Sequence, residues 1–230
     1  MKLFEILSPP DPSDAEDVIR TSFQDNVVSD LVAKSSLEGD ADAHQIIKDI
    51  KKQFPSIVNT ARFTVSDTVD RIRIKFNQDG TGAEISVPSK LHPELGEILI
   101  LHELAHLLYT KDLLCQKIVQ YRNAPQAFTI LRVLEDIAIE RKLEAEFPKA
   151  VEIFKRRSPH ARAAYDKNKP SKFSGALDQL FLFLRGYTTR PYLGGTAVLS
   201  AAETYLSSSD EDEKVDAVLT IAEQLMDFAS

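Results

Sequence analysis

The chain has 230 residues, with 28 Lys and Arg against 35 Asp and Glu and a formal net charge of −7. This length can bury a sizeable core, and the excess of acids with scattered basic residues, apart from the KRR run at 155–157, argues against a nucleic-acid-binding protein. The single cysteine, Cys115, excludes an intramolecular disulfide and a cysteine-based zinc cluster.

No segment approaches the roughly 20 apolar residues that a membrane span needs. The short apolar stretch at the N-terminus is broken by Glu5 and then by prolines. A lone cysteine fits a reducing compartment. We therefore expect a cytoplasmic protein with neither a membrane nor a nucleic acid as partner.

The first part of the chain predicts two helices followed by a small sheet. Apolar residues recur at helical spacing over 13–37 and 40–54, behind Ser and Asp residues that can cap a helix. Alternating apolar and polar residues then predict three strands, at 61–66, 71–76 and 83–88. A turn rich in Gly, Asn and Asp at 77–82 separates the last two strands.

The strand at 83–88, AEISVP, admits two interpretations. It can be an edge strand, along which an extended peptide would bind by strand addition. It can equally be an inner strand that packs Ile85 and Val87 into the core.

From Pro93 onward the pattern is almost wholly helical. Pro93 suits a first helical position, and the helix that it opens should end near Thr110. The acids Asp210 to Glu213 precede an apolar period, which is typical of a helix cap and solvated face rather than of a binding tail. Further helices are expected at 111–122, 123–147, 176–187, 194–206 and in the C-terminal segment, with a loop or broken helix at 158–175.

Ionisable residues interrupt the helix that Pro93 opens. His102 and His106 are four residues apart, so both imidazoles lie on one helix face and can bind one ion. Glu103 is displaced around the helix, where it can hold a water bound to that ion. This is the H-E-x-x-H arrangement, in which two His bind zinc and the Glu is the general base.

A third ligand is expected from the helix at 123–147. Glu135 and Asp136 are adjacent acids in a segment that is apolar nearly all round, and a buried carboxylate needs a metal or an ionic partner. The alternative explanation is ion pairing with a cation at helical spacing. The candidate cations are Arg132, Arg141 and Lys142.

HELAH followed downstream by LEDIAIE resembles the gluzincin branch of zinc metallopeptidases. More narrowly, residues 86–140 are similar to a metallopeptidase domain of bacterial and phage proteins that often precedes a von Willebrand factor A domain. The predicted elements indicate an α+β fold, mostly helical with a two- or three-stranded sheet before the HExxH helix, and the resemblance implies that this fold is zincin-like. The length favours one domain over 1–230, with a helical part at 12–60, a sheet and HExxH core at 61–147 and a helical part at 148–230.

The resemblance also implies the roles of the site residues. His102 and His106 would be zinc ligands, Glu103 the general base and Glu135 the third ligand, since gluzincins use Glu there. Asp136 would then accept the outer N–H of a ligand His and fix its tautomer, or would itself be the alternative ligand. Glu140 extends this network or forms a surface salt bridge. The cofactor would be Zn2+, although two imidazoles and a carboxylate also suit iron, cobalt or nickel.

The function implied is a zinc-dependent peptidase that hydrolyses peptide bonds in a peptide or protein substrate through a metal-activated water, with Glu103 as the base. A von Willebrand factor A type partner domain is implied by resemblance only. Two alternatives are a non-catalytic, metal-stabilised adaptor or assembly domain and a metal-free helical scaffold. The residues with suitable chemistry to stabilise an oxyanion, which the sequence does not rank, are Tyr109, His160, Tyr165 and Tyr187.

Overall fold

The computed structural model describes residues 39–76, 82–110, 117, 125–168, 172–190, 192 and 194–229. The chain divides into two compact units. The first, here called the sheet unit, comprises Ser29–Thr110 and Ile139–Ala164. The second, the helical unit, comprises Met1–Val28, Lys111–Ala138 and Tyr165–Ser230. The expectation of a single domain over 1–230 stays a prediction.

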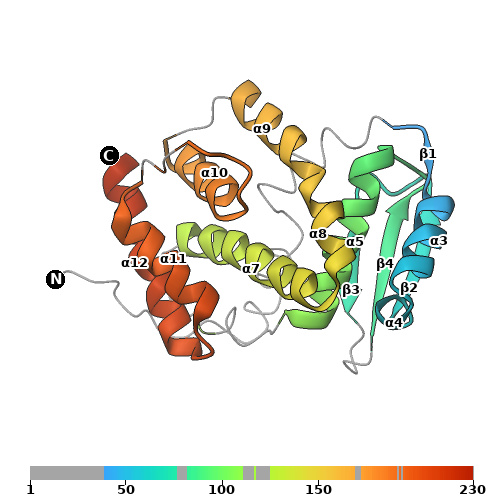
Figure 1. Cartoon of the computed structure of the whole chain (residues 1–230), viewed down its shortest axis with the longest axis horizontal. Helices are drawn as coiled ribbons and strands as arrows, with labels where there is room; N and C mark the ends of the chain where they lie inside the picture. Colours follow the sequence, from blue (N-terminus) through green and yellow to red (C-terminus); the bar gives the residue numbers. More distant parts are fainter. Residues whose placement is uncertain are drawn as a thin grey trace. The chain divides into compact units, whose positions relative to one another are not determined.

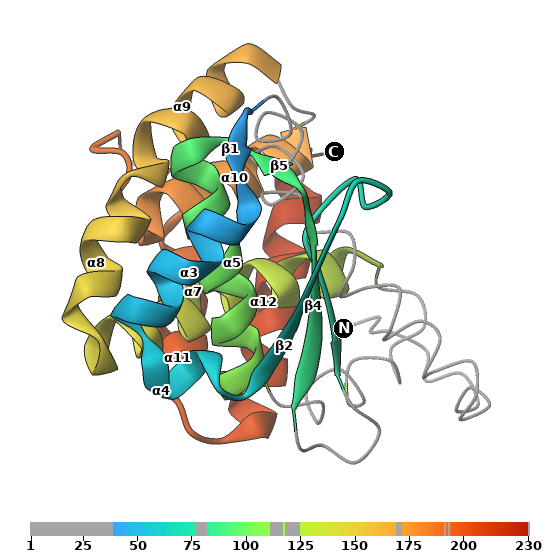
Figure 2. The ribbon, with the colours of Figure 1, turned by 90° about the vertical axis from the view of Figure 1, so that its right-hand side faces the viewer.

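A mixed three-stranded sheet forms one layer of the sheet unit (Figures 1 and 2). Its order is β2 (Ala61–Ser66), β4 (Ala83–Pro88), β3 (Arg73–Phe76), with β2 parallel and β3 antiparallel to β4. Since β4 pairs on both sides, the edge-strand interpretation is wrong and AEISVP is the inner strand. Alternation explains the burial, because Ile85 and Val87 lie on the covered face and are fully buried.

Two helices of the sheet unit pack their apolar sides into the same core as Ile85 and Val87 (Figure 2). Helix α3 (Ala43–Gln53) starts at Asp42, whose carboxylate accepts the backbone N–H of His44. Helix α5 (Pro93–Tyr109) follows a short antiparallel pair of β1 (Ala41–Asp42) with β5 (Lys90–Leu91). The one-turn helix α4 (Pro55–Val58) joins α3 to β2.

The long helix α7 begins at Pro125 and is followed by the shorter helices α8 and α9. Helix α7 spans Pro125–Glu146, and Phe147 and Pro148 mark the break before α8 (Pro148–Lys155). Helix α9 covers Arg157–Asn168. The first part of the segment expected as a loop or broken helix is therefore helical. Pro159 falls in the first turn of α9, where a proline removes no intrahelical hydrogen bond.

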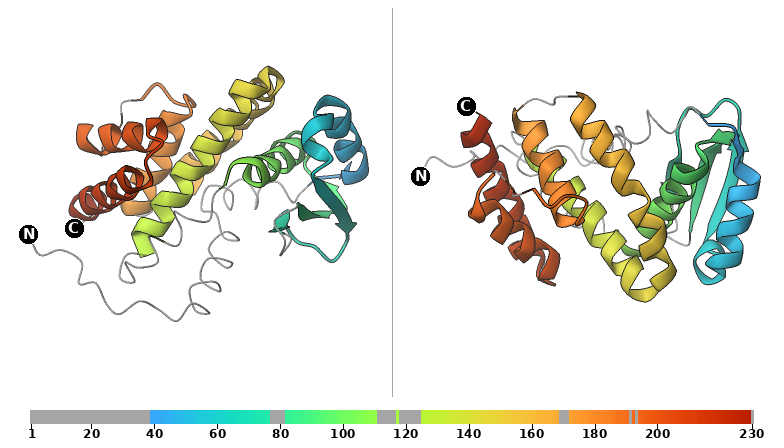
Figure 3. Two further views of the ribbon diagram at one scale, coloured as in Figure 1. Left: turned by 90° about the horizontal axis from the view of Figure 1, so that it is seen from below. Right: turned by 45° about the horizontal axis from the view of Figure 1, so that its top comes forward.

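The rest of the helical unit is built from α10 (Lys172–Leu184), α11 (Thr196–Ser207) and α12 (Glu211–Ala229). Helices α11 and α12 form an adjacent pair joined by a short turn, and α10 packs on α12 (Figure 3). Residues Val198, Val218, Ile221 and Leu225 are fully buried and account for the apolar period seen in the sequence.

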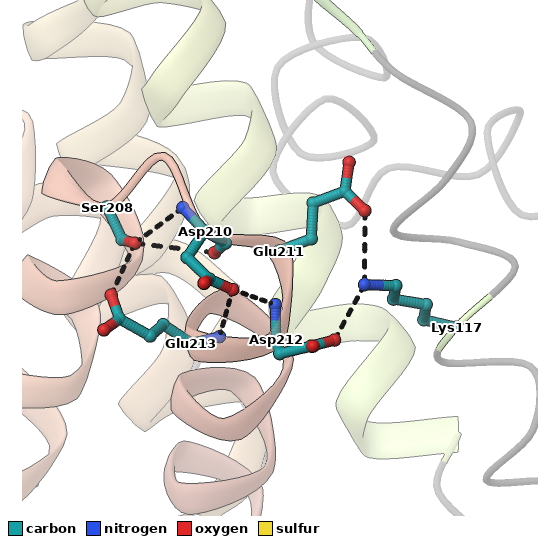
Figure 4. A network of polar contacts seen from close by, with 6 residues as sticks. All are labelled: Lys117, Ser208, Asp210, Glu211, Asp212 and Glu213. Atoms are coloured by element: carbon teal, nitrogen blue, oxygen red, sulfur yellow. Dashed lines mark hydrogen bonds and ion pairs between the residues drawn. The ribbon is translucent and has the colours of Figure 1, made fainter.

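The acidic run before α12 is a helix cap, as predicted (Figure 4). The Asp210 carboxylate accepts the backbone N–H groups of Asp212 and Glu213, at 2.8 and 3.3 Å. The Ser208 hydroxyl donates to the Glu213 carboxylate at 2.6 Å. Lys117 pairs with Asp212 at 2.7 Å and with Glu211 at 3.2 Å, which raises the pKa of its ammonium group.

The α+β class, mostly helical with a small sheet before the helix of His102 and His106, is confirmed. The expected helix at 13–37, nearly all of the one at 111–122 and most of the turn at 77–82 lie outside the described residues. Within the described part of the chain, no helix combines the length and apolar character needed to cross a membrane.

Close packing at Gly96 yields a prediction on stability. A Cβ added there would lie 2.9 Å from the Leu91 Cβ and 3.1 Å from the Ile46 Cδ1. Helix propensity alone would make Gly96→Ala stabilising by about 1 kcal/mol. We expect the steric overlap to dominate, with a loss of about 1–3 kcal/mol in the free energy of unfolding. Urea denaturation measures this quantity, and a gain in stability would show that α5 does not pack closely here.

Asp178 of α10 yields a prediction on pH dependence. Its side chain is buried, Oδ1 has no hydrogen-bond partner among the described residues, and desolvation raises its pKa to about 6 from 3.8. The ionised form is thus disfavoured in the folded state, so the cost is absent below about pH 4 and complete above about pH 6. Asp178→Asn should increase the free energy of unfolding by up to about 3 kcal/mol more at pH 7.5 than at pH 4.

Urea denaturation of Asp178→Asn at the two pH values tests this. Asp216→Asn, at an exposed position of α12, is the matched control and should give no such difference. Equal effects of Asp178→Asn at both pH values would contradict the assigned burial of the charge.

Candidate metal centre

Helix α5 carries two imidazoles into the protein interior. His102 is 1% exposed and His106 is 7% exposed, on a helix whose neighbours Ile98, Leu101 and Leu104 are fully buried. One helical turn separates the two side chains, and their Nε2 atoms approach to 3.2 Å. The rings are nearly perpendicular, with centroids 4.7 Å apart. The H-E-x-x-H spacing therefore produces the convergence of imidazole nitrogens that the sequence predicts.

The outer nitrogens of both rings have partners. Nδ1 of His102 lies 2.8 Å from Oε1 of Glu140, and Nδ1 of His106 lies 2.8 Å from the Thr110 hydroxyl. An ionised carboxylate only accepts, so in the neutral imidazole the Glu140 contact places the ring proton of His102 on Nδ1 and leaves a lone pair on Nε2. If His106 likewise donates from Nδ1 to Thr110, both Nε2 lone pairs face the same point, and only a cation there makes the arrangement favourable.

The same geometry also accommodates a metal-free state. His106 can donate from Nε2 to His102, with its Nδ1 accepting the Thr110 hydroxyl proton. In that state the imidazole pair is a satisfied polar group in the core. The two states differ in the tautomer of His106 alone.

Asp136 of α7 completes the group. It is 4% exposed, and one carboxylate oxygen lies with one nitrogen of each imidazole in a set whose members are all within 4.8 Å of one another. Asp136 precedes Glu140 by one turn of α7, so the two side chains share one face of that helix. Glu140 contacts the outer nitrogen of His102, and Asp136 lies beside the imidazoles. Two imidazoles and a carboxylate suit zinc, and also other divalent transition metals.

Glu135, the first choice for the third ligand, is not in this group. Its Oε2 accepts a hydrogen bond from the Tyr205 hydroxyl at 2.8 Å, and Tyr205 is a fully buried residue of α11. Adjacent residues on a helix point about 100° apart. The structure thus places the alternative, Asp136, beside the imidazoles and directs Glu135 toward α11.

Glu140 occupies the position that we expected for Asp136. It is fully buried and holds the outer nitrogen of His102, so it is not a surface salt bridge. Its second oxygen pairs with Arg157, which is 4% exposed. The contacts of Arg157 and Thr110 with this group were not predicted from the sequence. Thr110 could have been found, because it follows His106 by one helical turn.

Glu103 lies between the two His residues in sequence and is only partly buried. Its role as the base stays a prediction.

Three of the four residues expected as possible oxyanion donors make other contacts in the structure. Tyr109 packs against the core of the sheet unit, and burial together with the Glu146 carboxylate raises the pKa of its hydroxyl. Nε2 of His160 lies 3.0 Å from Glu94 in the first turn of α5, about two turns from His102. Tyr187 is buried against Phe181 in the helical unit. Tyr165 is partly buried, and the oxyanion donor stays unassigned.

Comparison of the chain with known protein families, curated proteins and solved structures gave no match. The resemblance to gluzincins therefore depends on the short segments that carry it, and the group beside the imidazoles holds Asp136 rather than the glutamate that this resemblance implies. What the site geometry supports directly is a candidate metal site formed by His102, His106 and Asp136.

Substitution of the two adjacent acids of α7 tests the ligand set. We expect the parent protein to bind about one equivalent of zinc and Asp136→Asn to lose most of it, because an amide oxygen is a much weaker zinc ligand than a carboxylate. Glu135→Gln should retain zinc, since Glu135 contacts Tyr205 and lies outside the group. Elemental analysis after gel filtration gives both values. Loss of zinc from Glu135→Gln but not from Asp136→Asn would restore Glu135 as the ligand.

Proposed function

We propose that the protein is a zinc-dependent peptidase in which His102, His106 and Asp136 hold the metal and Glu103 is the general base. The observation that carries the proposal is the buried convergence of two imidazoles and one carboxylate beside an H-E-x-x-H glutamate. Three protein ligands leave a position open for water, as in catalytic rather than structural zinc sites.

Each residue then has a defined task. The bound metal would supply a Lewis acid and a water of lowered pKa. The Glu103 carboxylate accepts the proton of the attacking water and returns it to the nitrogen of the leaving amine, so that peptide hydrolysis needs no second acid. Glu140 keeps His102 in the tautomer whose Nε2 carries the lone pair, and Thr110 can do the same for His106.

One observation favours a second candidate, a non-catalytic domain that the metal stabilises. All three ligand residues are at least nine-tenths buried, as are Glu140 and Arg157. Structural metal sites are closed in this way. The two functions differ in their need for Glu103. A peptidase needs it as a base, whereas a structural site needs no base.

The substitution Glu103→Gln separates the two functions. It keeps the size of the side chain but removes its ability to accept a proton near neutral pH. For a peptidase we expect unchanged zinc content and melting temperature but at least a 100-fold loss of cleavage of a peptide library, about the effect of removing a general base. Mass spectrometry of the digested library provides the measurement.

The matched control is Glu94→Gln, which changes an exposed acid in the first turn of α5 and should leave cleavage intact. A parent protein that holds zinc and cleaves no peptide, or cleaves as well with Gln at 103, would favour the non-catalytic domain.

A further inference from the structure

Arg157 provides a buried positive charge beside Glu140, the residue that contacts His102. Arg157 is the first residue of α9, and its guanidinium pairs with Oε2 of Glu140, while Oε1 of the same carboxylate lies 2.8 Å from Nδ1 of His102. All three side chains are almost completely buried. The contacts form a chain from guanidinium to carboxylate to imidazole, and the Nε2 of that imidazole faces His106 at 3.2 Å.

A carboxylate with both oxygens engaged has little freedom to rotate. We infer that Arg157 is a positioning residue of the metal centre, since by holding Oε2 it directs Oε1 of Glu140 to His102 and so orients the ligand imidazole. This inference depends on the proposed metal site. It goes beyond the ligand set, because the contact that carries it joins Arg157 to Glu140, which is not one of the three ligands.

The guanidinium is itself held in place. Its Cζ lies 5.7 Å from the ring centre of Phe154, a fully buried residue of α8. Arginine suits the task because its planar fork is rigid and always charged. Burying the Glu140 carboxylate beside a cation also avoids leaving a second buried negative charge uncompensated one helical turn from Asp136.

The neighbouring residue supplies a matched control. Arg156 pairs with Glu97 of α5, whereas Arg157 pairs with Glu140 of α7, so each arginine joins the junction of α8 and α9 to another helix through one carboxylate. The Arg156 side chain is 40% exposed, against 5% for Arg157, and Glu97 does not contact either histidine in the contacts described. A general effect of losing an arginine–glutamate pair would appear in both substitutions.

The experiment compares the zinc affinity of Arg157→Met and Arg156→Met, each measured by competition with a chromophoric chelator on folded protein. We expect Arg157→Met to weaken zinc binding by about 10- to 100-fold, the usual effect of losing an outer partner of a ligand. Arg156→Met should change it by no more than about twofold, as for an exposed pair. Arg157→Lys, which restores the charge, should recover part of the affinity.

A double substitution tests whether Arg157 acts through Glu140. Glu140→Gln removes the charge that Arg157 meets, so adding Arg157→Met to Glu140→Gln should cost little further affinity. This neutral pair also leaves no buried unpaired charge, so it remains measurable if Arg157→Met alone does not fold. Equal affinities of Arg157→Met and Arg156→Met, or additive losses in the double variant, would overturn the inference.

Nitrogen chemical shifts of the histidine rings in the metal-free proteins keep this result separate from the proposed function. In the parent, His102 should show a protonated Nδ1, and in Arg157→Met a mixture of tautomers. If the parent binds no zinc, the proposed function fails, and the same spectra still decide whether Arg157 orients His102. An unchanged His102 spectrum in Arg157→Met would overturn the orienting role.

Discussion

The need to satisfy polar groups inside an apolar interior governs the arrangement around α5. His102 and His106 are surrounded by leucines and isoleucines, where an unpaired polar group costs about 1–3 kcal/mol. Each outer nitrogen has a partner, and Glu140 in turn has Arg157. The inner nitrogens approach each other and Asp136, and this convergence makes the group a candidate metal site.

The parts of this arrangement that follow from local sequence could be predicted. A four-residue spacing in an apolar helix places His102 and His106 on one face, and Pro93 places the helix start. The alternating strands and the capping acids before α12 are equally local, and the structure has them where the pattern indicates. The need for a carboxylate from the helix at 123–147 followed from its apolar surroundings.

What depends on how one helix faces another could not be predicted. Glu135 and Asp136 differ by a rotation of about 100° on α7, and no sequence period distinguishes them when the helix is apolar nearly all round. The Tyr205 contact, which accounts for the direction of Glu135, comes from a residue far along the chain. The same holds for Arg157, which reads in the sequence as part of a basic run but pairs with a fully buried acid. Likewise the central place of β4 depends on the parallel pairing with β2, which a turn signal cannot reveal.

The residues of the candidate metal centre lie far apart in the sequence. This separation affects how the protein would acquire a metal. The two imidazoles belong to one short helical segment, whereas Asp136, Glu140 and Arg157 reach them only through contacts between distant segments. Bringing such distant segments together costs conformational entropy, and contacts within the short helical segment alone do not offset this cost. The nascent HELAH helix therefore offers an ion two imidazoles and nothing more. Retention of a metal ion by this site would then require the folded tertiary structure, so bound metal would report on the integrity of that structure and not on helix formation alone.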